Sequence, residues 1–140
     1  NISECISAKR KLIDRAKRIL NTCNYEYQFE TDQCKEEMKR LQAKWKTIGR
    51  AGDQDKLLRE QFQEIQDQFW KHTKLEAKRM RLLDLSDALG SLEDDFECAK
   101  IYHQWNKMER LVGLIDKKQD AILNLQAEIT QLEEELGLFD

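Results

Sequence analysis

The residues of this chain whose type and spacing could support chemistry are lysines and arginines on two expected helices. They lie within the first 20 residues and just after residue 70: Lys9, Arg10, Lys11, Arg15, Lys17, Arg18, Lys71, Lys74 and Lys78. Several cations on one helix face attract phosphate groups or an acidic partner. We therefore predict a candidate basic binding surface on the first and third helices. The alternative is an ordinary solvated helix face.

The histidines and carboxylates do not form the spacings that enzymes and metal sites use. The two histidines, His72 and His103, stand on separate expected helices. No His-x-x-x-His, Cys-His or Glu-x-x-His pattern suggests a zinc or di-iron site. The sequence also contains no glycine-rich phosphate loop and no nucleophile elbow. We therefore expect a protein that is not an enzyme, with no catalytic residue, no metal site and no cofactor.

The cysteines and the hydropathy bear on the compartment. Four cysteines, none in a Cys-x-x-Cys pair, are expected as reduced, buried or half-buried thiols: Cys5, Cys23, Cys34 and Cys98. No apolar run approaches the roughly 20 residues of a membrane span, and no signal peptide is visible. We therefore expect a cytoplasmic protein. Because the chain begins at Asn1 without a methionine, we expect it to be a piece of a longer one.

The elements that must position these residues follow from composition and apolar spacing. Proline is absent and glycine occurs at five positions, which favours a few long helices. A first apolar stripe contains Cys34, Met38, Leu41, Trp45 and Ile48, and a second contains Leu58, Phe62, Ile65 and Phe69. Steps of three and four place each stripe on one helix face. We predict helices at about 2–22, 31–49 and 53–89, with facing stripes and Trp45 in the core.

The turns between these helices are predicted from their residue types. Thr31 or Asp32 can cap the second helix and Asp53 the third, and Gly49 suits a left-handed helix end. The alternating aromatic residues of 23–30 resemble a strand, but no partner strand exists in the sequence. We therefore expect a loop whose aromatic side chains cap the bundle: Tyr25, Tyr27 and Phe29.

A motif within these stripes resembles a known family. Residues 41–49, LQAKWKTIG, fit the L-Q-x-x-W-K-x-I-G motif of a bacterial family of domains of unknown function. The resemblance covers roughly residues 9–75. It departs at Arg59, where the family has Trp, and in lacking a proline after the motif. It implies an all-helical domain, often repeated in tandem, with no known catalytic residues. The structural motif comprises Trp45, Ile48, Gly49, Leu58, Phe62, Phe69 and Trp70.

A heptad repeat dominates the C-terminal third. Apolar residues alternate at three and four from Met108 to Phe139, with Lys118 in the seam. We expect the helix to continue through Gly113, which falls at an outward position. Glu128 would face Glu133 in a parallel homodimer, so antiparallel pairing is favoured. An oligomer through the seam stays open, and the central seam residues are Ile115, Ile122, Leu125, Ile129 and Leu132.

Gly90 and Ser91 predict the end of the third helix, with Ser91 and Asp94 capping the next one. This divides the chain into a three-helix domain at 1–90 and a long heptad helix at 91–140. Folding back there would lay residues 92–127 along 54–89, and residues 71–81 opposite about 100–110. The expected fold class is all-α, an elongated antiparallel helical bundle with a coiled-coil-like C-terminal helix.

Charge is distributed unevenly along the chain. Residues 1–50 contain 12 Lys and Arg against 7 Asp and Glu, whereas residues 51–140 contain 12 against 20. The two parts are therefore expected to neutralise each other in part. We predict a helical protein-interaction or scaffold module from a larger bacterial protein, with an unidentified protein partner. The alternative is a nucleic-acid-associated protein that uses the basic faces of the first and third helices.

Overall fold

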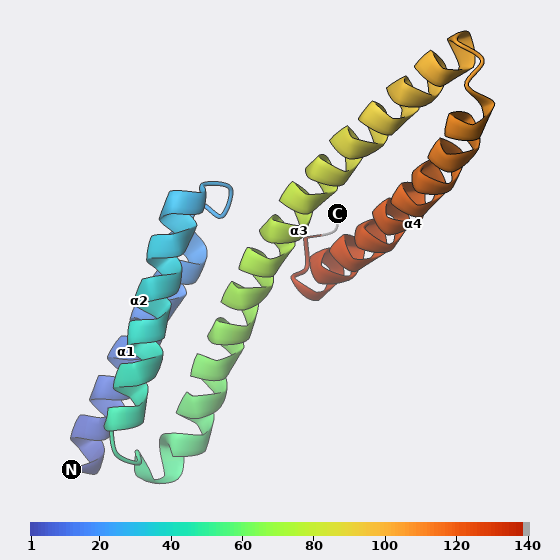
Figure 1. The fold of residues 1–140 in the computed structure, drawn as a ribbon. Coiled ribbons are helices and arrows are strands. Elements are labelled where there is room, and N and C mark those ends of the chain that lie inside the picture. The colour runs from blue at the N-terminus through green and yellow to red at the C-terminus, as the bar shows by residue number, and fades with distance from the viewer. Residues whose placement is uncertain (139–140) are drawn as a thin grey trace. The chain divides into compact units, whose positions relative to one another are not determined.

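The computed structural model describes residues 1–138 and places helices throughout them. The order is α1 (Ile2–Thr22), α2 (Gln28–Thr47), a short 3₁₀ helix η1 (Gly52–Gln54), α3 (Asp55–Ile101) and α4 (Trp105–Glu135) (Figure 1). No strand occurs among the described residues, so the all-α prediction is confirmed. Phe139, the last residue of the predicted seam, lies outside them.

The chain forms two compact units, unit 1 (Asn1–Lys74) and unit 2 (Leu75–Asp140), and α3 contributes to both. The core of unit 1 lies among α1, α2 and the first part of α3. Its buried residues include the apolar face of α1 and both predicted stripes: Leu12, Ile13, Ala16, Ile19, Met38, Leu41, Leu58, Phe62, Ile65 and Phe69. Trp45 is half-buried and stacks on Phe62, with ring centroids 4.3 Å apart and planes 6° apart. Because both rings lie on the stripe faces, the motif residues serve chiefly to pack this core.

Helix α1 has the predicted bounds because its first turn is capped. The Asn1 side chain accepts a hydrogen bond from the Glu4 backbone N–H, and the Glu4 side chain returns to Asn1, forming a capping box.

Helix α2 begins three residues before the predicted start, at Gln28 with Tyr27 as N-cap. Thr31, predicted as the cap, is instead helical and buried. Its hydroxyl lies 3.2 Å from the Tyr25 carbonyl and ties the preceding loop to the helix. Of the three aromatic residues predicted to cap the bundle, only Tyr25 packs against the core; Tyr27 and Phe29 are exposed. The loop is therefore shorter than predicted, because Gln28 to Glu30 complete the first turn of α2.

The connection from α2 to α3 also differs from the prediction. Ile48 ends α2 with an extended backbone, and the left-handed glycine is Gly52, with φ of 63°, not Gly49. The cap of the connection comes from Asp55, not Asp53. The Asp55 carboxylate accepts the Ala51 backbone N–H at 3.0 Å, and this closes the turn onto the start of α3.

Helix α3 does not end at Gly90. It continues to Ile101, so the predicted capping box at Ser91 does not form. A Cβ at Gly90 would meet nothing within 4 Å, so close packing does not require a glycine at this position. Its cost of about 1 kcal/mol in a helix interior is outweighed by the apolar residues that flank it on one face. The predicted domain boundary at residue 90 therefore does not coincide with the end of a helix. The two units meet between Lys74 and Leu75, inside α3.

Within unit 2, the C-terminal part of α3 and α4 run side by side in opposite directions (Figure 1). The seam of α4 is buried or half-buried at every position from Met108 to Leu136, and α4 is continuous through Gly113, as predicted. It packs on a second seam in α3 with the same spacing of three and four: Leu75, Lys78, Leu82, Leu85, Leu89, Leu92, Phe96 and Ala99. Leu75 clusters with Leu125, Ile129 and Leu132.

The pairing of the two helices in unit 2 differs from the predicted register. Lys78 reaches Glu128 at 3.2 Å and Arg79 reaches Glu133 at 3.1 Å. Residues 78 and 79 were predicted to lie opposite about 100–110. The shift follows directly from the position of the turn, which is at 102–104 instead of 90–91.

Candidate functional site

Lys9, predicted as part of the basic surface, is buried in an ion pair. Its ammonium lies 2.6 Å from the Asp55 carboxylate and 4.9 Å from the centre of the Trp45 ring. Lys9 is 4 % exposed and Asp55 is 7 % exposed. The hydrogen bond from Lys9, followed by that from the Ala51 N–H, lowers the pKa of the Asp55 carboxyl below its usual value. Lys9 therefore joins α1 to the start of α3 and is unavailable to a ligand.

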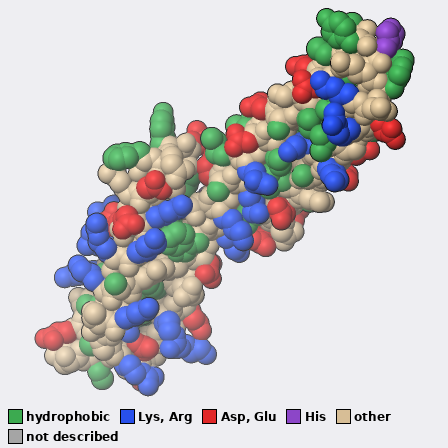
Figure 2. Space-filling model, in the orientation of Figure 1, with side chains coloured by type: hydrophobic (Ala, Val, Ile, Leu, Met, Phe, Trp, Pro, Cys, Tyr) green, Lys and Arg blue, Asp and Glu red, His purple; other side chains and the backbone are tan. Residues whose placement is uncertain are grey.

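The other predicted basic residues have several environments. Arg10 donates to the Gln54 side chain at 2.9 Å, and Arg15 pairs with Glu37 at 3.3 Å. On α1, Lys11, Lys17 and Arg18 are exposed, and Figure 2 shows several Lys and Arg side chains on the visible face of unit 1. On α3, Lys74 is exposed and Lys71 is half-buried, whereas Lys78 belongs to unit 2 and pairs with Glu128. The structure thus leaves a small group of exposed cations on α1.

The first turn of α2 presents an exposed aromatic surface with acidic surroundings. Tyr27 is 65 % exposed and Phe29 is 76 % exposed. A hollow of about 560 Å³ lies beside Phe29, and it is lined by Phe29, Asp32, Gln33, Glu36, Glu37 and Arg40. Residues 26–37 contain five acidic residues and one lysine. We call Tyr27, Phe29 and the lining of this hollow the α2 surface. Sequence reasoning missed it by assigning both aromatic side chains to the core.

The Cys23 thiol, just before α2, is poorly ionised at neutral pH. Burial, together with the neighbouring Cys34 thiol, raises the pKa of Cys23 to about 12. Burial also raises the pKa of the Tyr25 hydroxyl, which donates to the Leu20 carbonyl at 2.9 Å. A thiol must ionise to act as a nucleophile, so Cys23 is a structural residue. All four cysteines are free; Cys98 is exposed and the others are half-buried.

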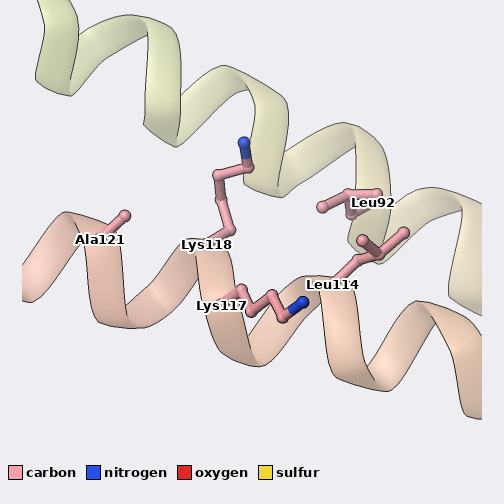
Figure 3. Close-up of a pocket in the computed structure, with 5 residues that line it drawn as sticks. All are labelled: Leu92, Leu114, Lys117, Lys118 and Ala121. Carbon is pink, nitrogen blue, oxygen red and sulfur yellow. The ribbon is translucent and has the colours of Figure 1, made fainter.

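Unit 2 contains a second hollow, where Lys118 interrupts the apolar seam. It measures about 330 Å³ and is lined by Leu92, Leu114, Lys117, Lys118 and Ala121. Figure 3 shows the Lys118 side chain extending from α4 toward α3. None of the ion pairs in the described part of the chain includes Lys118. The hollow therefore results from a flexible, charged side chain at a position where the rest of the seam has apolar residues.

The described residues contain neither a metal-ligating cluster nor a membrane-spanning helix. Within residues 1–138, no group of three or more His, Cys, Asp or Glu side chains could hold a metal ion. No helix in the same range is long and apolar enough to cross a membrane.

Comparison with known proteins finds a family of domains of unknown function over part of the chain. Residues 3–54 match the family model described as Domain of Unknown Function (DUF349). The chain is similar to that family over α1, α2 and η1, and the match stops just before α3. This match confirms the prediction of a domain-of-unknown-function family. The predicted resemblance extended to residue 75, whereas the match ends at residue 54. No curated protein and no solved structure matches the chain.

Proposed function

We propose that this chain is a non-enzymatic helical module that binds another protein through the α2 surface, as a cytoplasmic segment of a larger bacterial scaffold. The observation that carries the proposal is the exposure of Tyr27 and Phe29, with Phe29 lining a largely acidic hollow. Large apolar side chains in contact with water are a typical mark of an interaction site. Aromatic side chains in particular contribute strongly to protein interfaces.

The charge of the α2 surface indicates the kind of partner. Its carboxylates repel phosphate groups and attract Lys and Arg. The Phe29 ring supplies an apolar contact next to Asp32 and Glu36, which line the same hollow. A basic protein segment with apolar anchor residues would complement both features.

The heptad seam is a weaker candidate for the interface. Leu125, Ile129 and Leu132 are buried with Leu75 of the same chain. An oligomer formed through this seam would therefore have to displace α3. We infer instead that unit 2 is an intramolecular antiparallel coiled coil, and that unit 1 represents one copy of a domain that repeats in tandem in the longer protein.

The test is cross-linking in living cells through a photoreactive residue introduced at Phe29. The same residue introduced at Leu57, which is 56 % exposed on α3, is the matched control. We expect a discrete cross-linked protein from position 29 that is absent from position 57 and is lost when Asp32 and Glu36 are changed to Lys. Identical products from both positions, or no products from either, would contradict the proposal.

Nucleic-acid association is the second candidate, and one observation supports it. Lys11, Lys17 and Arg18 are exposed on α1, and none of them forms an ion pair within residues 1–138. Anisotropy with labelled oligonucleotides across a salt series tests this candidate, because phosphate binding weakens steeply with salt. Binding lost on Lys11→Glu and Arg18→Glu would support it. No binding at low salt would eliminate it.

A further inference from the structure

We propose that the turn between α3 and α4 is a docking site for a membrane surface that contains anionic lipids. The hairpin tip, residues 98–108, combines three strongly exposed apolar side chains with two lysines. Ile101 is 69 % exposed, Tyr102 is 74 % exposed and Trp105 is 63 % exposed. Figure 2 shows hydrophobic side chains gathered at the end of unit 2 where α3 turns into α4, beside a histidine.

The backbone of the tip forms a hydrogen-bonded turn. His103 adopts a left-handed conformation with φ of 54°. The Gln104 N–H donates to the Ala99 carbonyl at 2.9 Å, and the His103 N–H donates to the Lys100 carbonyl at 3.2 Å. This hydrogen-bond pair is the Schellman motif that closes a helix end. The apolar residues therefore do not reach water by local unfolding; the turn presents them outward.

The charge of the tip fits an anionic surface. Residues 98–108 contain Lys100 and Lys107 and no acidic residue, and Glu97 and Glu109 directly flank this stretch. The α2 surface of unit 1 has comparable exposed aromatic residues but five acidic residues around them. The two surfaces therefore attract opposite kinds of partner.

The composition of the tip favours a bilayer over a nucleic acid. Trp and Tyr rings concentrate at membrane–water interfaces, where an aliphatic side chain such as Ile101 enters the acyl region. Single-stranded nucleic acid binds through stacked aromatic platforms. The His103 and Trp105 rings are tilted by 44° with centroids 5.5 Å apart, so they do not form a parallel slot for a base. Ile101 has no ring on which a base could stack.

The primary test is flotation of the whole chain with lipid vesicles. One set contains phosphatidylcholine alone, and a second contains equal parts of phosphatidylcholine and phosphatidylglycerol. We expect co-flotation with the anionic vesicles. Tyr102→Ser with Trp105→Ser should weaken it about tenfold or more. Lys100→Gln and Lys107→Gln should each weaken it about fivefold.

The matched control is Tyr27→Ser with Phe29→Ser, which removes two equally exposed aromatic side chains from the α2 surface. We expect these changes to leave flotation unaltered. An equal loss with the control would mean unspecific adsorption and would overturn the proposal. Absence of flotation with anionic vesicles would also overturn it. If the tip variants then weakened binding to oligonucleotides, the tip would be a nucleic-acid site instead.

Tryptophan emission locates the contact independently. On addition of anionic vesicles, we expect the emission of the wild-type chain to shift to shorter wavelength, and the shift to be absent in Trp105→Phe. Because Trp45 and Trp70 pack against the core of unit 1, they should contribute little to it. A shift that persists in Trp105→Phe would show that the tip does not enter the lipid.

Discussion

The Lys9 ammonium lies 2.6 Å from the Asp55 carboxylate, and both side chains are almost fully buried. Removing one member of such a pair leaves a charge without its partner in a low-dielectric environment. We therefore expect Lys9→Met to lower the melting temperature markedly. The double variant Lys9→Met with Asp55→Leu should recover part of the loss, because it removes the unpaired charge but also the acceptor of the Ala51 N–H. Lys11→Met, on the exposed side of α1, is the control and should change little. Equal melting temperatures for Lys9→Met and Lys11→Met would contradict the structural role of the pair.

Acid should weaken unit 1 through Asp55. The pKa of this carboxyl is lowered in the folded state, chiefly by Lys9, from a usual value of 3.8. A lowered pKa stabilises the fold at all pH values above 3.8, and the stabilisation is lost as the pH falls through the folded-state value. Melting temperatures from neutral pH into this acidic range should therefore fall more steeply for the wild type than for Asp55→Asn. Parallel curves would show that Asp55 does not contribute to the pH dependence.

Two tryptophans in different environments provide a matched comparison. Trp45→Ala removes a ring that stacks on Phe62 and should cost about 3 kcal/mol of unfolding free energy. Trp105→Ala removes an exposed ring and should change the unfolding free energy by no more than about 0.5 kcal/mol. Urea denaturation monitored by circular dichroism measures both. Similar losses for the two variants would mean that Trp45 is not part of the packed core.

Two glycines should respond in opposite directions to alanine. Gly113 lies inside α4, and a Cβ added there would meet nothing within 4 Å, so Gly113→Ala should add about 1 kcal/mol of stability. Gly52 has φ of 63°, and a Cβ there would approach Ile2 Cγ2 at 3.2 Å. Gly52→Ala should therefore cost about 1–2 kcal/mol. Thermal melting resolves these changes, and a stabilising effect at Gly52 would contradict the described turn.

Lys118 should limit the stability of unit 2. Replacing it with leucine would extend the apolar seam into the hollow beside Leu92 and Ala121. We expect Lys118→Leu to add about 1 kcal/mol, and Gln119→Leu on the exposed side to change the unfolding free energy by less than about 0.5 kcal/mol. Chemical denaturation measures the difference. A loss of stability in Lys118→Leu would show that the ammonium has a stabilising role that its surroundings do not reveal.

The sequence by itself determined the helices and the faces they bury. The two stripes of unit 1 and the seam through Gly113 depend on spacing within one helix, because residues three and four apart share a face. The second seam, from Leu75 to Ala99, has the same spacing of three and four and could have been recognised in the sequence. It could have shown that Gly90 lies inside a helix.

The tertiary structure decided where the chain turns and which charges are buried. The α3–α4 turn lies at 102–104, since two long seams bury more apolar surface when they pair along their length than a short helix ended at Gly90 would. Lys9 lies in a basic run with Arg10 and Lys11, and this local sequence does not reveal that its side chain is buried. Its partner, Asp55, lies 46 residues away in the sequence, so only the packing of α1 against the start of α3 brings the two together.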